Sequence, residues 1–264
     1  MFRRLSIFMS SALVFALFLT AGAAHAQQGS RSFPLEGFTA IALKGSSNLK
    51  VVQGAEFSVT ARGEEEDLVH AKAEVNGDTL ELSVEPESKS LFGVVTVSSE
   101  PEVNFRVTLP VIDGIRVTGS GDATADTLES ENLDLRVTGS GLIRVEKVAA
   151  ESLSTGVTGS GDLILGTVLA VHGSAGITGS GDVRMDNFIG EDFSGQIKGS
   201  GDMAIGGKVA NLNVTVMGSG DFMGRSLSAT NAGGSVMGSG DIVLKRPANE
   251  SFSVMGSGDV ALVD

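Results

Sequence analysis

The chain has 264 residues, with 36 Gly, no Cys, no Trp and no Tyr, and a net charge of −13. A single domain of this length can bury a sizeable core. The absence of cysteine excludes disulfides, thiolate metal sites and a cysteine nucleophile. The negative charge repels phosphate backbones, so we expect no nucleic-acid partner.

Residues 1–26 have the pattern of a secretory signal peptide. Arg3 and Arg4 precede an apolar stretch, and the segment ends in Ala24-His25-Ala26, a small-x-small cleavage pattern. Cleavage after Ala26 removes two Arg from the net charge of −13 and leaves −15. No second apolar stretch is long enough to span a membrane. We expect an exported protein, located in the periplasm, at the cell surface or outside the cell.

The next segments divide by their regularity. We expect a linker over 27–34 and one domain over 35–264, with irregular coils over 35–114 that cap a regular stack over 115–264. Strand-like runs occupy 57–60, 79–84, 94–97 and 103–109, and Asn76-Gly77-Asp78 indicates a turn. The acidic run 63–67 predicts a loop, or the start of a short helix that continues from Leu68 to Ala73.

A repeat dominates the second half of the chain. The triplet Gly-Ser-Gly recurs at intervals of 18 to 20 residues, and Asp follows it in every copy except one, where Leu142 stands instead. The copies begin at Gly119, Gly139, Gly159, Gly179, Gly199, Gly218, Gly238 and Gly256. A fixed period of this kind indicates a stack of similar units.

Apolar residues alternate with polar or small ones on both sides of each triplet, which is a strand pattern. Val157 and Leu163, for example, are expected to be buried and stacked on their equivalents in neighbouring copies. A third apolar column contains Leu128, Val148, Val168, Phe188, Val209 and Leu227. The pattern predicts an all-β fold, a parallel β-helix or β-solenoid with coils of about 20 residues. A leucine-rich repeat and a β-propeller fit less well, because their signatures are missing. Glycine at both ends of each triplet is expected to provide positive φ at a corner.

Several motifs together resemble those of the bacterial head-GIN domain family, whose members are labelled autotransporter adhesins. The matching residues are Phe38, Ile41, Gly45, Ser46, residues 76–80 and the corners from Gly119 onward. The resemblance covers nearly the whole mature chain. It implies a right-handed parallel β-helix with an adhesive role at the cell surface, and it brings no catalytic residues.

The acidic column at the corners is the first candidate site. Carboxylates stacked at about 4.8 Å would repel one another, and calcium could relieve that repulsion. Alternatively, each Asp accepts hydrogen bonds from its own corner. The candidate column comprises Asp162, Asp182, Asp202, Asp221, Asp241 and Asp259, and apart from possible calcium no metal or cofactor is expected.

The residue before each corner changes character along the stack. It is Thr in four copies, then Lys198, then Met217, Met237 and Met255. By alternation this column points outward, so the three Met form a possible contact surface for self-association or for a partner. Variation on a solvent face is the alternative.

These observations predict an exported scaffold that is not an enzyme and that binds a protein or glycan of the cell envelope. The alternative function is a polysaccharide-acting β-helix enzyme. The mature histidines, His70 and His172, lie far apart in sequence and are expected to be solvent or loop residues rather than a catalytic pair.

Overall fold

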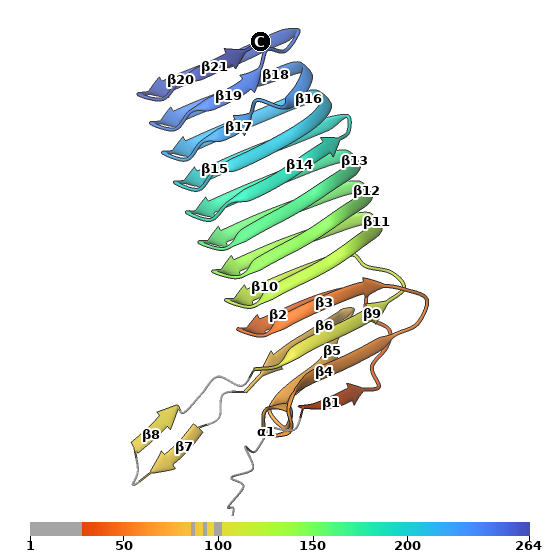
Figure 1. The fold of residues 1–264 in the computed structure, drawn as a ribbon. Helices are drawn as coiled ribbons and strands as arrows, with labels where there is room; N and C mark the ends of the chain where they lie inside the picture. The colour runs from red at the N-terminus through yellow and green to blue at the C-terminus, as the bar shows by residue number, and fades with distance from the viewer. Residues whose placement is uncertain (1–27, 86–87, 92–93, 98–101) are drawn as a thin grey trace, which may run out of the picture.

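The computed structural model describes residues 28–85, 88–91, 94–97 and 102–264, so the predicted signal peptide lies outside the described residues. Parallel strands stack coil upon coil (Figure 1). In neighbouring coils Val137 is the register partner of Val157, which is the partner of Ile177. The structure therefore confirms the predicted β-solenoid. Among the described residues, no helix has the length and apolar character needed to span a membrane.

The elements divide into a cap and a stack. The cap contains β1 (Gln28–Phe33), β4 (Ser58–Glu64), α1 (Glu65–Leu68), β5 (Ala71–Asn76), β6 (Thr79–Val84), β7 (Ser88–Leu91), β8 (Val94–Val97) and β9 (Asn104–Leu109). The stack contains β2 (Ala40–Gly45), β3 (Asn48–Gln53), β10 (Gly114–Gly119), β11 (Asp122–Gly139), β12 (Leu142–Gly159), β13 (Asp162–Gly179), β14 (Val183–Ile189), β15 (Asp192–Gly199), β16 (Met203–Gly218), β17 (Phe222–Gly224), β18 (Leu227–Gly238), β19 (Ile242–Lys245), β20 (Asn249–Gly256) and β21 (Val260–Val263).

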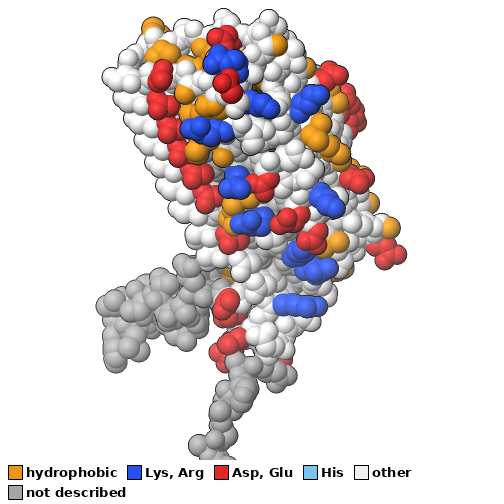
Figure 2. Space-filling model, turned by 45° about the horizontal axis from the view of Figure 1, so that its top comes forward, with side chains coloured by type: hydrophobic (Ala, Val, Ile, Leu, Met, Phe, Trp, Pro, Cys, Tyr) orange, Lys and Arg blue, Asp and Glu red, His pale blue; other side chains and the backbone are white. Residues whose placement is uncertain are grey.

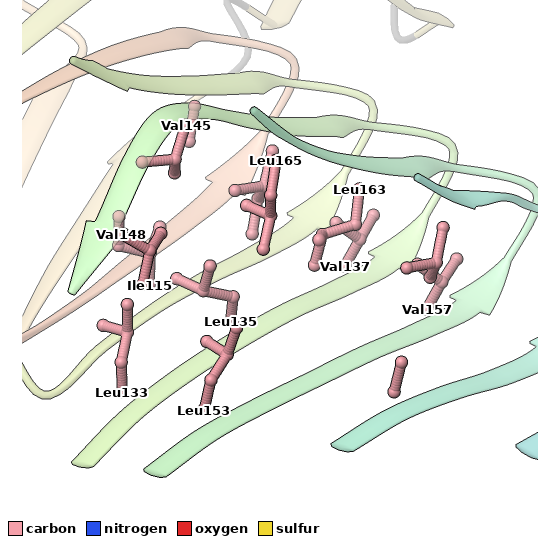
Figure 3. Close-up of a cluster of buried hydrophobic side chains, with 14 of the residues drawn as sticks. Ile115, Leu133, Leu135, Val137, Val145, Val148, Leu153, Val157, Leu163 and Leu165 are labelled. Atoms are coloured by element: carbon pink, nitrogen blue, oxygen red, sulfur yellow. The ribbon is translucent and has the colours of Figure 1, made fainter. Parts of the chain in front are cut away.

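The core runs along the axis of the stack. Val157 and Leu163 are 1% and 0% exposed and stack on their predicted equivalents in the coils on either side. The outward neighbour Thr158 is exposed. Figure 3 shows such inward side chains from both walls of several coils packed together. Burial of each large aliphatic side chain contributes about 1.5–3 kcal/mol, so the repeated columns hold successive coils together.

The two glycines of a corner have different roles, which corrects the sequence interpretation. Gly159 has a φ of +117°, whereas Gly161 does not adopt a positive φ. A Cβ on Gly161 would instead lie 2.3 Å from the carbonyl oxygen of Gly141 in the preceding coil. The first glycine both turns the chain and lies against the preceding coil, since a Cβ on Gly159 would lie 2.4 Å from the Gly139 carbonyl oxygen. The second is needed only for that close approach.

One apolar column differs from its prediction. The register pairs Phe188 with Gly207 and Gly207 with Leu227, so Val209 does not occupy this column, although it is buried. The coil is one residue shorter than the coil before it, and the pattern alone does not locate the missing residue. Aromatic packing also departs from simple stacking, because Phe188 and Phe193 form an edge-to-face pair over the small Gly173.

The cap is antiparallel where the stack is parallel. Strand β1 pairs with β4, so residues 28–33 are a strand within the segment expected to be a linker. The helix ends at Leu68 instead of continuing to Ala73, because residues 71–76 form β5 and pair with β6 across the predicted turn at Gly77. Strands β2 and β3 form the first coil of the stack, against β10 and β11.

Candidate functional site

The acidic column forms a continuous ladder of hydrogen bonds. The carboxylate oxygen Oδ1 of each Asp accepts the backbone N–H of the Asp one coil further on. The N···O distances are 3.2 Å for Asp182 to Asp162, 2.9 Å for Asp202 to Asp182 and Asp221 to Asp202, and 2.8 Å for Asp241 to Asp221 and Asp259 to Asp241. The ladder begins after Leu142, where the Asp162 N–H donates to the Gly141 carbonyl instead. Acidic side chains follow one edge of the stack in Figure 2.

This geometry changes the interpretation of the column. The carboxylates do not cap their own corners, as the turn interpretation expected, but tie each coil to the next. Hydrogen bonds to a charged acceptor contribute about 1.5–3 kcal/mol each, which offsets repulsion between adjacent carboxylates. Within the described residues, no three His, Asp or Glu side chains are arranged to hold a metal ion. Calcium binding by the column stays a prediction.

The side face, defined here by the outward residues of the strands that enter the corners, is polar over the coils from β10 to β13. Thr118, Thr138, Thr158 and Thr178 are exposed and stacked in register. Beside them Gly156 pairs with Gly176, and a Cβ on Gly176 would meet nothing within 4 Å. Gly156 is buried, and a Cβ there would lie 2.9 Å from Nη1 of Arg136, so the part of this row that is open to a ligand or another surface is at Gly176.

The methionine column continues the same row toward the last coil. Met217, Met237 and Met255 are in register, as predicted. Met217 and Met237 are half-buried, and Met255 is 64% exposed. The inward Val254 of this coil is 43% exposed, against 0% for Val236 one coil earlier. The apolar surface therefore increases at the last described coil.

The two histidines are placed in different regions. His70 lies in the turn after α1 in the cap, whereas His172 lies on β13 in the middle of the stack. His172 is exposed, as expected of a solvent residue, but it lies on a strand and its Nδ1 lies 2.9 Å from Oδ2 of Asp192 in the next coil. Asn211 donates to the other oxygen of Asp192 at 2.8 Å. The pKa of Asp192 is lowered, chiefly by the Asn211 hydrogen bond and further by His172.

A hollow of about 340 Å³ lies beside this pair on the side face. Its lining comes from three successive coils: Asn132, Leu133, Asp134, Ser152, Leu153, Ser154, His172, Gly173 and Ser174. The sequence interpretation missed this cluster. The signal was available, since Asn132, Ser152, His172 and Asp192 are each 20 residues apart, but their types change from coil to coil and no repeated column is visible.

The comparisons with known proteins agree with this architecture. Residues 37–175 and 167–263 match the family model described as "Putative auto-transporter adhesin, head GIN domain". No protein with a curated description matches the chain.

Solved structures from two Parabacteroides species share the fold. A putative adhesin from Parabacteroides distasonis is 19% identical, with a TM-score of 0.78 over 90% of this chain and 98% of that one. A putative lipid binding protein from the same species is 21% identical, with a TM-score of 0.79 over 90% and 97%. A putative adhesin from Parabacteroides merdae is 18% identical, with a TM-score of 0.78 over the same shares. The family match, which extends over most of the chain, shows that this protein belongs to the head GIN domain family of auto-transporter adhesin-like proteins.

Proposed function

We propose that this protein is an exported binding scaffold of the cell envelope or surface, and that the side face holds a glycan or protein partner. The observation that carries the proposal is the in-register row of exposed Thr beside Gly176, where a Cβ would meet nothing within 4 Å. A rigid parallel stack keeps these groups at a fixed spacing of about 4.8 Å, so a partner with a regular surface can contact several coils at once. The name of the family and the signal-peptide pattern support a surface role.

The test compares two double variants of equal charge. Thr158→Lys with Thr178→Lys places bulk and charge on the side face, and Thr127→Lys with Thr167→Lys makes the same change at exposed positions of the other wall. Binding of the purified protein to a panel of envelope polysaccharides and surface proteins is measured by interferometry. We expect the first pair to weaken binding at least about tenfold, a change of 1.4 kcal/mol, and the second to leave it unchanged. Equal loss in both pairs, or no binding across the panel, would contradict the proposal.

A further inference from the structure

One polar column on the side face combines the residue types of an acyl-transfer site. The register places Asn132, Ser152, His172 and Asp192 at the same position of four successive coils. Neighbours in this column are therefore separated by about 4.8 Å along the stack. The order is amide, hydroxyl, imidazole and carboxylate. A serine hydrolase needs the same order of groups: an oxyanion donor, a nucleophile, a base and a residue that orients the base.

The base and its orienting group are already in contact. Asp192 Oδ2 lies 2.9 Å from His172 Nδ1, and this contact holds the proton on Nδ1 so that Nε2 can accept one. Asp192 is itself held in place, because Asn211 donates to its Oδ1 and in turn accepts from Asn231 at 2.8 Å. This chain of amides fixes the orientation of the carboxylate and, through it, the imidazole ring.

Ser152 differs from the other two hydroxyls in the hollow. Ser174 Oγ donates to the Leu153 carbonyl at 3.4 Å, and Ser154 Oγ accepts from Arg136 at 3.2 Å. Ser152 is half-buried, and its Oγ makes no hydrogen bond with the described residues, including His172. Hydrogen bonds between nucleophile and base are often long in ligand-free sites and tighten when substrate binds. The hollow of about 340 Å³ gives a small substrate room beside Ser152 and His172.

We propose that Ser152, His172 and Asp192 hydrolyse short-chain acyl esters of carbohydrates. The serine hydroxyls of the hollow can bind a polar alcohol, the apolar surface to which Leu133 and Leu153 contribute can hold a small acyl group, and a volume of about 340 Å³ is small for a long lipid chain. This activity goes beyond the proposed binding role and departs from the expectation that the chain is not an enzyme.

The reaction balances without a further reactant except water. His172 Nε2 takes the proton of Ser152 Oγ while Oγ bonds to the acyl carbon, and the Asn132 side-chain amide donates to the oxyanion. The ester C–O bond breaks, and the alcohol leaves with the proton from His172. Water then attacks the acyl-serine, its proton passing through His172, and the carboxylic acid is released with Ser152 restored. Asp192 is a positioning residue throughout.

The experiment uses the full exported chain with an aryl acetate, an acetylated sugar and a fluorophosphonate probe. We expect mass spectrometry to find the probe on Ser152. Labelling and turnover should fall at least about 10²-fold in Ser152→Ala and His172→Gln. Asp192→Asn should lower turnover and change its pH profile, because the wrong tautomer of His172 is then favoured. Ser160→Ala and Ser180→Ala, at exposed corner positions outside the hollow, are the matched controls and should retain full activity.

Circular dichroism of each variant checks that the fold is intact. A folded wild-type chain with no turnover and no label on Ser152 between pH 6 and pH 9 would overturn the proposal. Turnover that survives Ser152→Ala but is lost in His172→Gln would also overturn it, because His172 would then activate water directly. Binding by the side face is measured separately with the Thr variants, so either proposal can fail alone.

Discussion

At each corner both glycines leave room for the preceding coil, and only the first also needs a positive φ. Gly159 provides a left-handed backbone, and Gly161 provides room for the carbonyl oxygen of the preceding coil. The sequence predicts that both positions need glycine, but it does not separate these reasons, because close approach between coils is visible only once the coils are stacked. A substitution at the second position therefore reports on coil packing and not on turn conformation.

Gly161→Ala tests this difference. The new Cβ would lie 2.3 Å from the Gly141 oxygen, so the coils must separate locally. We expect a loss of about 1–3 kcal/mol in the free energy of unfolding, measured by urea denaturation. Gly176→Ala is the control: nothing lies within 4 Å of its Cβ and its φ is not positive, so a neutral or slightly stabilising effect is expected. A similar loss at both positions would refute the steric explanation.

A second residue-scale prediction concerns Asp192. Its pKa is lowered mainly because Asn211 donates to the carboxylate. Asp192 thus stabilises the fold at pH values above the ordinary Asp pKa, and this contribution is lost as pH falls through the lowered pKa. Asn211→Ala should raise the pKa of Asp192 toward its ordinary value, as followed by carboxyl NMR titration. Asn249→Ala, two coils further along the amide ladder, should leave that pKa unchanged. An unchanged pKa in Asn211→Ala would contradict the assignment.

At the scale of elements, the acidic ladder joins coils that are already joined by their backbones. Each carboxylate accepts the backbone N–H of the Asp in the next coil. In a simple parallel ladder that N–H would donate to a backbone carbonyl, as the Asp162 N–H does in the coil that follows Leu142. The alternation of residues predicts an in-register column, but it does not predict which amide each carboxylate binds. The reason is that this choice depends on the local path of the chain just after the corner.

The ladder predicts different results for two changes at Asp202. Asp202→Asn keeps an oxygen that can accept the Asp221 N–H, so its stability should be close to that of the wild type. Asp202→Ala leaves that amide without its acceptor and should cost about 1–3 kcal/mol. Both are compared by thermal denaturation with and without calcium. A calcium-dependent rise in melting temperature that Asp202→Asn abolishes would favour a cation site over the structural role.

At the scale of the molecule, the repeat made the stack predictable and the cap only partly so. A 20-residue period places Val157 on Val137 without knowledge of the structure, because equal spacing becomes register in a solenoid. Strands β1 and β5 pair antiparallel, so no period marks them. The pairing of His172 with Asp192 follows from the same period, yet only the structure shows that their side chains meet.

The last described coil leads to a prediction about assembly. Strands β20 and β21 each pair with one described neighbour only, and Val254 and Met255 are exposed beside them. Unpaired strand edges and apolar patches favour contacts between chains. We expect the protein to self-associate through this end in light scattering, and Met237→Lys with Met255→Lys to return it to a monomer.

The control for this prediction is Thr158→Lys with Thr178→Lys, which adds the same charge to the same outward row away from the last coil. It should leave the association unchanged. A monomeric wild type at high concentration would show that the exposed edge is not a contact between copies.

Each coil of the stack bonds only to the coils on either side of it. The number of coils, and with it the length of the stack, can therefore change by mutation. Deleting or duplicating twenty codons would remove or add one coil and change the length of the stack by about 4.8 Å, without altering the cap or the last described coil. The intervals of 19 and 18 residues before Gly218 and Gly256 show that a coil can be shorter and still pair in register with the preceding coil. Related chains are therefore expected to differ in length by whole coils, which unequal recombination between repeats would add or remove.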